Sequence, residues 1–461
     1  MLKDNLSPFK SLMADGAFTE LRSQVNRKRR VSMIKGEIVT NMREDITGVG
    51  CRVYKDGLYG FASSPSLDNE SIKRVLKKAS ENAAFMSSRI KKDRPAIADA
   101  RVGGYATDYV RNDTEQKYYI EVLRELDDYI SKNCTGLINR SLVAYEDSME
   151  KMLVVSQGTD GHTIVPRSYI YIFMTVEGRD GNPLEVFTPV GGFGIFPENF
   201  SDLKEVYSET DRLYKLAMDK IDGVYSKAGL NTVILSGELA GMLAHEAVGH
   251  TVEADLVLAG SVAAKNLNKQ VASPLVSMTD FAHTAFGKDA PLPVYLDDEG
   301  ILAEDEVLIK DGILTGYMNS RETAGHFGMA PKGNARGFMF DDEPLIRMRN
   351  TAVLPGESSL DDMISSVDDG YYLISSNNGQ ADSTGEFMFG VTTGYEIKNG
   401  KLGRALLDTT ISGIAFEMLK TVDMVGNEVS WSSSGFCGKK QLMPVGLGGP
   451  ALRCKVMMGG R

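Results

Sequence analysis

Three segments of the chain have apolar residues at the spacing of an amphipathic helix. The first begins after Asp68, a residue type that often caps helices. Its apolar stripe consists of Ile72, Val75, Leu76, Ala79 and Ala83. The second segment covers residues 115–130 and the third covers residues 203–221. We therefore expect three surface helices, each packing one face against a core.

Other segments have the shorter pattern of β-strands, and turn signals join some of them into hairpins. The segments predicted to be extended include residues 31–40, 151–157 and 168–178. Hairpin turns are predicted at Asp56-Gly57, between two strands of residues 51–64, at Asp311-Gly312 and at Asn399-Gly400. Helical and extended patterns alternate only loosely along the chain. This favours an α+β fold with antiparallel sheet over a doubly wound fold.

The chain has 461 residues, which is too long for one small core. A domain boundary is predicted within residues 223–230, "GVYSKAGL", because a helical pattern ends before it and an apolar strand pattern follows it. We divide the chain into an N-terminal α+β domain, residues 1–225, and a C-terminal domain, residues 226–461. The C-terminal domain is predicted to be rich in β-structure and to carry one helix with two histidines.

The net charge of −11 disfavours a phosphate backbone as a partner. The only basic run, residues 26–30, is interpreted as a solvated helix end. No apolar stretch is long enough to cross a bilayer, and residues 1–16 lack the apolar region of a secretory signal. The four cysteines lie far apart and suggest no disulfide framework. We expect a cytoplasmic protein that binds neither nucleic acid nor membrane.

Residues 242–255, "MLAHEAVGHTVEAD", contain two of the five histidines on either side of a glutamate. Ser236 can cap a helix that includes this segment. His245 and His250 are five positions apart, so an ideal α-helix would point them about 140° apart, too far for one metal ion. A π-bulge would bring both onto one face, and Gly249 makes a bend there inexpensive. We predict that the helix is distorted between the two histidines.

If both imidazoles bind one ion, Glu246 is placed to act as a general base toward water that attacks a carbonyl. A catalytic zinc site needs three protein ligands and an open position. Candidates for the third ligand are Glu253, Asp255 and a cysteine, whose thiolate is favoured by its softness. The spacing alone leaves another interpretation open. In it, His245 makes a core contact, His250 lies near a helix end and Glu246 is in solvent.

The motif "HEAVGHTVEAD" resembles that of the TldD/PmbA family of metallopeptidases, and further landmarks follow in the family's order along nearly the whole chain. These are "GVGCRVYKDGLYGFASS", "EDEVLIKDGILTGYMNSRETAG", "GNARG", "PLIRMRNTAVLPGESSLDDM", "GYEIKNGKL", "SGFCGK" and "PVGLGGPALR". The resemblance is most specific at residues 245–250 and 435–439. It implies a two-domain peptidase that binds zinc through both histidines of H-E-x-x-x-H and a cysteine late in the chain.

Carried onto this chain, the resemblance implies that His245 and His250 bind zinc and that Glu246 is the base. The family's cysteine lies in an F-C-G-K setting, which makes Cys437 the third ligand of one zinc ion per chain. The other cysteines have no such counterpart and are expected to be small buried hydrophobic residues. They are Cys51, Cys134 and Cys454.

Four more residues are weaker candidates for the site. His162 lies in a turn and is expected at the surface. His283 and His326 follow the motif and could line a cleft, although an exposed or satisfied histidine is the simpler interpretation for each. Arg336 could bind a peptide carboxylate or pair with a local acid.

The function implied by the resemblance is that of a cytoplasmic zinc peptidase that hydrolyses unfolded polypeptides or small peptides. It also implies a homodimer, or a heterodimer with a sister subunit that lacks the motif. The alternative is a non-catalytic binding or regulatory subunit, of the kind linked to control of DNA gyrase, with a structural metal. A closed structural site would need a fourth protein ligand, for which Glu253 and Asp255 are nearest.

Overall fold

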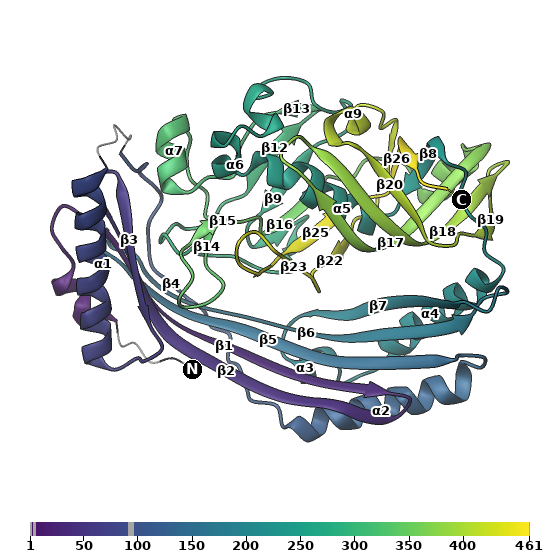
Figure 1. Ribbon diagram of the computed structural model, residues 1–461, viewed down its shortest axis with the longest axis horizontal. Coiled ribbons are helices and arrows are strands. Elements are labelled where there is room, and N and C mark those ends of the chain that lie inside the picture. The colour runs from purple at the N-terminus through teal and green to yellow at the C-terminus, as the bar shows by residue number, and fades with distance from the viewer. Residues whose placement is uncertain (1, 3–5, 91–95, 461) are drawn as a thin grey trace.

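The computed structural model describes residues 2, 6–90 and 96–460, and its N-terminal half is built on one long curved sheet (Figure 1). The strand order is β3-β2-β1-β5-β6-β4, and β7 also pairs with β6. All pairs are antiparallel except β4 with β6. The strands are β1 (Phe18–Ile34), β2 (Glu37–Lys55), β3 (Leu58–Ser64), β4 (Tyr105–Ala106), β5 (Asn139–Val155), β6 (Asp160–Glu177) and β7 (Pro183–Phe193).

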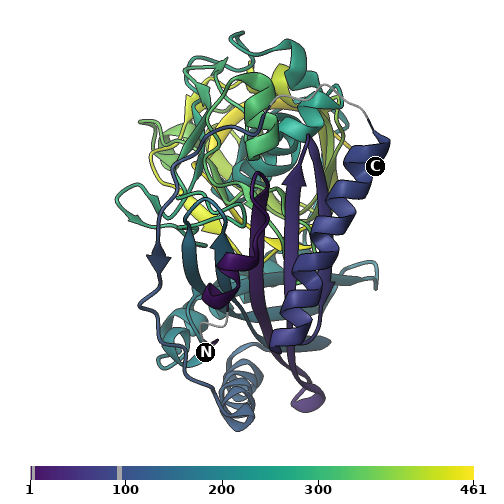
Figure 2. The same ribbon diagram turned by 90° about the vertical axis from the view of Figure 1, so that its left-hand side faces the viewer.

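Helices cover one face of this sheet, as Figure 2 shows for α1 (Asn69–Arg89), which lies along β2 and β3. The other end of the same face packs against α2 (Gln116–Asn133), α3 (Phe196–Asn199) and α4 (Lys204–Ile221). A short 3-10 helix, η1 (Ser7–Leu12), precedes β1. The three predicted amphipathic helices are confirmed as α1, α2 and α4. The Asp68 side chain caps α1 by accepting a hydrogen bond of 2.8 Å from the Ser71 amide.

The opposite face of the sheet is polar and contacts the C-terminal half. Side chains project alternately from the two faces of a strand, so β1 presents Leu21, Val31 and Met33 to the helices. On the other face, Arg22, Gln24 and Asn26 donate hydrogen bonds to backbone carbonyls of residues 338–342. The two halves are thus joined by side chain to backbone hydrogen bonds.

The basic run at residues 26–30 lies within β1, so its interpretation as a solvated helix end was wrong. Neighbouring strands supply carboxylates to it: Arg27 pairs with Glu150 at 2.8 Å, and Arg29 pairs with Asp45 at 2.6 Å. Two charges of this basic run are therefore paired with carboxylates of the neighbouring strands, which allows the run to lie within a sheet.

The C-terminal half contains two larger sheets. The first has the order β13-β12-β9-β16-β25-β22. Its strands are β9 (Met278–Phe281), β12 (Glu306–Lys310), β13 (Ile313–Leu314), β16 (Asn350–Val353), β22 (Ser430–Ser432) and β25 (Gly446–Gly449). The small two-stranded sheets are β10 (Thr284–Ala285) with β11 (Lys288–Asp289), β14 (Ala335–Arg336) with β15 (Leu345–Ile346), and β23 (Phe436–Cys437) with β24 (Met443–Pro444).

The second larger sheet has the order β17-β8-β26-β20-β18-β19, and β21 pairs with β26. A further pairing of β17 with β18 closes the strands from β17 to β18 into a ring. Its strands are β8 (Gly229–Leu235), β17 (Asp369–Ala381), β18 (Glu386–Lys398), β19 (Lys401–Ala405), β20 (Thr409–Ile414), β21 (Met424–Val425) and β26 (Leu452–Met458). The α+β class with mostly antiparallel sheet is confirmed, whereas the predicted boundary between residues 225 and 226 stays a prediction.

The histidine-containing helix begins as α5 (Gly237–Met242) and lies between the two larger sheets, in contact with β16, β17 and β25. Its apolar residues belong to the main hydrophobic core; they include Leu239, Leu243, Ala244, Ala247 and Val248. The helices that follow it are η3 (His250–Val252), α6 (Ala254–Leu258), η4 (Val262–Lys265), α7 (Arg321–Phe327), α8 (Leu360–Ser365) and α9 (Ala415–Leu419). None of the described helices is long and apolar enough to cross a membrane.

The three predicted hairpin turns are confirmed between β2 and β3, β12 and β13, and β18 and β19. Both turn residues have positive φ in each, for example 48° at Asp56 and 85° at Gly57, as a type I′ turn requires. A fourth turn of this kind, at Lys35 and Gly36, interrupts residues 31–40, which were expected to be extended throughout. The sequence pattern does not indicate this turn, because a lysine stands where type I′ turns usually have aspartate or asparagine.

Candidate metal centre

The histidine helix changes from α to π geometry at the motif. Ser236 caps its start by accepting a hydrogen bond of 3.3 Å from the Leu239 amide. The π-helical segment η2 (Leu243–Gly249) follows α5, and the His250 amide donates to the carbonyl of His245, five residues earlier. The extra residue in the turn brings the two imidazole rings to a centroid separation of 5.1 Å. The predicted distortion between the histidines is confirmed.

Gly249 serves this helix through its small size, not through its backbone freedom. Its φ of −52° and ψ of −49° are ordinary right-handed values that most residues adopt. A Cβ atom at this position would lie 2.1 Å from Sδ of Met348, which is itself buried, and 3.1 Å from the carbonyl oxygen of Ala244. Because Gly249 has no side chain, the π-helical segment can pack closely against Met348, which lies between β15 and β16.

Cys437 reaches the helix from a loop late in the chain. It ends the two-residue strand β23, which pairs with β24. The fully buried Arg347 holds this loop by donating hydrogen bonds to three backbone carbonyls, those of Cys437 at 2.7 Å, Lys439 at 2.8 Å and Gln441 at 2.8 Å. A planar guanidinium with several fixed donors suits such a task. The loop is thereby fixed to the segment between β15 and β16 that carries Arg347.

The structure brings together one nitrogen of each motif histidine and the Cys437 sulfur. One donor atom from each of the three residues lies within 4.8 Å of the others, and Sγ of Cys437 is 3.3 Å from Nε2 of His250. Among the described residues, no other three or more histidine, cysteine or acidic side chains come together with such a spacing. The remaining cysteines are buried in hydrophobic clusters, as expected: Cys51, Cys134 and Cys454.

The two histidines have different electrostatic surroundings. His245 is almost completely buried, and neither of its ring nitrogens has a hydrogen-bond partner. Burial lowers its pKa well below the usual value, and the positive charges of His250 and Arg347 lower it further. Burial acts in the same direction on His250, but hydrogen bonds to Cys437 and Glu253 outweigh it and raise that pKa to about 10. The lowered pKa favours the neutral imidazole for His245, which is the form that binds metals, and both of its ring nitrogens are without a hydrogen-bond partner.

Glu246 lies beside both imidazoles and is more exposed than either of them. Its carboxylate oxygens are 4.0 Å from Nε2 of His245 and 3.8 Å from Nε2 of His250. About a quarter of its side chain stays exposed, at 27%. Burial raises the pKa of this carboxyl, the nearby His250 opposes the rise, and Glu253 adds to it. A carboxylate at this place can exchange a proton with a molecule that enters the site from solvent.

Glu253 and Asp255, the two acids considered as further ligands, are engaged elsewhere. Oε2 of Glu253 lies 2.8 Å from Nδ1 of His250, the ring nitrogen that does not face Cys437. The same oxygen is 3.3 Å from Nζ of Lys439, and Asp255 pairs with Lys439 at 2.8 Å. Glu253 is therefore placed to orient His250, and Lys439 ties the cysteine loop to the end of the helix.

The weaker candidates from the sequence do not join this group. His162 is half-buried and lies 3.2 Å from a carboxylate oxygen of Glu150. His283 stacks on Tyr295 with ring centroids 4.8 Å apart, whereas His326 is exposed on α7. Arg336 is buried and forms no ion pair with an acid among the residues that the structure describes. It donates hydrogen bonds to the carbonyls of Met348 and Pro444.

Sequence patterns alone did not single out Arg347, Lys439 or the orienting role of Glu253. Arg347 and Lys439 both lie within stretches that carry the family resemblance, "PLIRMRNTAVLPGESSLDDM" and "SGFCGK", which was the available signal. Glu253 follows His250 by three positions, a spacing that allows contact on one side of a helical turn.

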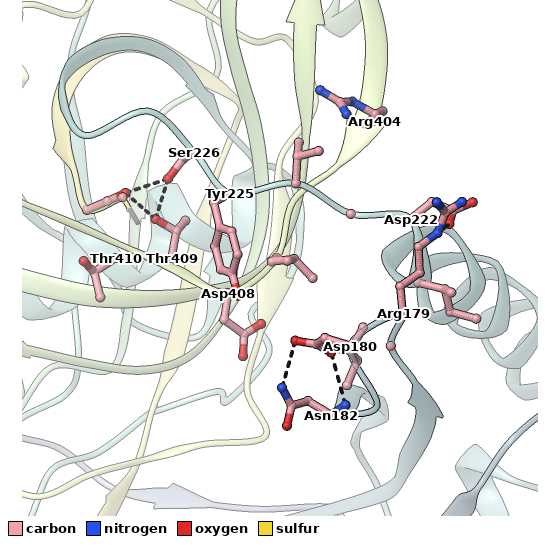
Figure 3. Close-up of a pocket in the computed structure, with 18 residues that line it drawn as sticks. Arg179, Asp180, Asn182, Asp222, Tyr225, Ser226, Arg404, Asp408, Thr409 and Thr410 are labelled. Carbon is pink, nitrogen blue, oxygen red and sulfur yellow. Dashed lines mark hydrogen bonds and ion pairs between the residues drawn. The ribbon is translucent and has the colours of Figure 1, made fainter.

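A surface cavity of about 1060 Å³ lies away from the motif, between the β6–β7 turn and segments 221–226, 404–410 and 459–460 (Figure 3). Its polar side chains bond one another: Asp180 accepts hydrogen bonds from Asn182, and Ser226 bonds Thr409. None of the motif residues lines it, so the cavity contributes no donor to the candidate metal centre.

Comparison with known proteins gives a family for this chain. The family model described as "PmbA/TldA metallopeptidase C-terminal domain" matches residues 228–460, and the model for domain 1 of the same group matches residues 19–83. A metalloprotease of Archaeoglobus fulgidus is 31% identical over 96% of this chain and 99% of its own length. A zinc metalloprotease TldD homolog of Saccharolobus solfataricus is 34% identical over 55% of this chain and 57% of its own.

Solved structures agree with this assignment at the level of the fold. TldE from Thermococcus kodakarensis superimposes with a TM-score of 0.77 over 98% of this chain and 99% of its own, at 18% sequence identity. The predicted metallopeptidase activity is confirmed at the level of the family, since the full-length relatives are named metalloproteases. The chain belongs to the TldD/PmbA family of metallopeptidases.

Proposed function

We propose that this protein is a zinc-dependent peptidase whose single zinc ion is held by His245, His250 and Cys437. The observation that carries the proposal is the convergence of two imidazoles and a thiol, with donor atoms within 4.8 Å of one another. The two unpartnered ring nitrogens of buried His245 support it, because a buried polar atom without a partner costs about 1–3 kcal/mol. Two nitrogens and one sulfur suit zinc, and one relative is named a zinc metalloprotease.

His245, His250 and Cys437 would supply three protein ligands, the number that catalytic zinc sites use. Zinc bound there would act as a Lewis acid, which would polarise a peptide carbonyl and lower the pKa of water to about 7. Glu246 takes the proton from a water molecule that attacks the peptide carbonyl and delivers it to the leaving amine, because its partly exposed carboxylate lies 3.8 Å from Nε2 of His250. Glu253 keeps Nε2 of His250 directed at the metal by holding Nδ1.

Replacement of Glu253 by glutamine is expected to weaken zinc affinity by about 10–100-fold, the usual effect of removing a partner of a ligating histidine. The amide holds Nδ1 less strongly than a carboxylate and loses the ion pair with Lys439. Zinc dissociation constants measured by competition with a chromophoric chelator test this result. Asp255→Asn is the matched control, since Asp255 pairs with Lys439 and not with the histidine. Equal affinities in the two variants would contradict the role of Glu253.

The substrate in this proposal is an unfolded polypeptide or a small peptide, and the protein acts in the cytoplasm. The net charge of −11 supports the exclusion of nucleic acid as a partner. The family resemblance supports a homodimer or a heterodimer with a sister subunit, and TldE has the same fold. We also propose that residues 1–225 and 226–461 are the two domains of the chain.

Removal of the metal provides the direct experiment on the function. The purified protein is expected to cleave a reduced, unfolded polypeptide into short products, to stop when a chelator has removed the metal, and to recover when stoichiometric zinc is restored. Product formation is followed by mass spectrometry, with the protein at equal concentration in all three states. Cleavage that persists at the same rate after metal removal would contradict a zinc peptidase, as would an absence of cleavage with zinc bound.

A further inference from the structure

The loop that carries Cys437 lies between the two halves of the protein. Residues 433–441 contain little regular structure apart from β23. Arg347 of the C-terminal half holds the part of the loop from Cys437 onward. The part before Cys437, residues 433–435, is held by side chains of β6, which belongs to the N-terminal sheet.

Arg167 provides the main contact from the N-terminal sheet to this loop. Its Nη1 donates hydrogen bonds to the carbonyls of Ser433 at 2.8 Å and Gly435 at 3.1 Å. Its guanidinium also covers the ring of Phe436, with 4.2 Å between the central carbon and the ring centroid. Phe436 directly precedes Cys437, so Arg167 contacts the residue next to the thiol and two carbonyls just before it.

Arg167 is itself held rigidly. It is 1% exposed, and Asp147, which lies directly opposite on β5, accepts hydrogen bonds of 2.7 Å from Nε and 2.9 Å from Nη2. This bidentate pairing leaves Nη1 as the end of the guanidinium that contacts the loop. The half-buried carboxylate of Asp147 fixes the arginine, and the arginine fixes the loop.

Two tyrosines extend the same contact along β6. The hydroxyl of Tyr171 donates to the carbonyl of Ser434 at 2.9 Å, and the hydroxyl of Tyr169 lies 2.8 Å from the Ser433 hydroxyl. Both tyrosines project from the sheet face that carries Arg167, because every second residue of a strand faces the same way. Three consecutive side chains on one face of β6 therefore bind three consecutive loop residues.

We propose that Arg167 is a positioning residue for the metal centre: the N-terminal sheet, through Arg167, fixes the Cys437 thiolate at the distance from the histidines that metal binding needs. This inference rests on the proposed role of Cys437 as a ligand. The two histidines lie on a helix buried between two sheets, whereas Cys437 lies on a loop whose geometry depends on these contacts. Loss of Arg167 therefore weakens the metal–sulfur bond selectively.

The experiment compares Arg167→Met with Arg22→Met by titration of the metal-free proteins with Co²⁺, which takes zinc-type sites and absorbs in the near ultraviolet when a thiolate binds it. Arg22 is a buried arginine of the same sheet that donates hydrogen bonds to the carbonyls of Met339 and Asp342 and pairs with the carboxylate of Asp298 at 2.7 Å. Arg167→Met is expected to lower the Co²⁺ affinity by about 10–100-fold and to weaken the thiolate band, as removal of an outer partner does. Arg22→Met is expected to keep both within severalfold of the unmodified protein.

Equal affinity and an equal band in Arg167→Met and the unmodified protein would overturn the inference while leaving the proposed ligands intact. Equal losses in both arginine variants would also overturn it, because they would reflect a general loosening between the halves. Absence of the thiolate band from the unmodified protein would instead contradict Cys437 as a ligand, and with it the proposed function.

Tyr171→Phe tests the same contact with less risk to folding, since it removes one hydroxyl from a half-buried position. The loss of one hydrogen bond to the loop is expected to lower Co²⁺ affinity by about two- to tenfold. An affinity unchanged from that of the unmodified protein would contradict the role assigned to β6, even if Arg167→Met fails to fold.

Discussion

Replacement of Glu246 by glutamine is expected to lower kcat/KM for peptide hydrolysis by about 10²–10⁴-fold, the usual contribution of a general base. Glutamine has nearly the same size and shape, but its amide cannot accept the proton of an attacking water molecule. The zinc content is expected to stay at that of the unmodified protein, because Glu246 is not in the group formed by His245, His250 and Cys437. Steady-state kinetics and elemental analysis of the same preparation measure both quantities.

Glu238→Gln is a suitable control for this experiment, because Glu238 is another acid on the same helix. Its carboxylate accepts a hydrogen bond of 3.1 Å from Ser375, well before the motif, and glutamine can retain that contact. Full activity in Glu246→Gln would remove the base from the mechanism. Loss of zinc from Glu246→Gln would make the residue a ligand, and an absence of hydrolysis by the unmodified protein with zinc bound would favour the binding-subunit alternative.

Local patterns predicted much of the fold. The helix that follows Asp68 and the turn at Asp56 and Gly57 depend on interactions within a few residues, and both are present. The basic run at 26–30 was misjudged because its acidic partners, such as Glu150, lie on another strand far away in sequence. Pairing of that kind is set by the tertiary fold and leaves no local signal.

The candidate site divides in the same way. The five-residue spacing of His245 and His250 conflicts with a straight α-helix, so the π-helical segment could be predicted from geometry alone. Cys437 is separated from His250 by 187 positions, and only the family resemblance pointed to it. Arg347 and Arg167 act on backbone carbonyls, which are present in every sequence, so no residue pattern could reveal their partners.

Replacement of Cys437 by serine is expected to abolish stoichiometric zinc binding, because the two histidines would remain without the thiolate that completes three protein ligands. Cys454→Ser is the matched control. Cys454 is also a buried free cysteine, but it lies on β26 within the main hydrophobic core, where burial raises its thiol pKa to about 12. Circular dichroism of both variants establishes that each remains folded.

The most direct test of the metal centre is therefore the zinc content per chain of three proteins purified without added metal: the unmodified protein, Cys437→Ser and Cys454→Ser. The proposed site predicts about one zinc per chain in the unmodified protein and in Cys454→Ser, as expected for one three-ligand site, and little zinc in Cys437→Ser. Zinc lost only from Cys454→Ser, or absent from all three even after zinc is supplied, would contradict the site formed by His245, His250 and Cys437.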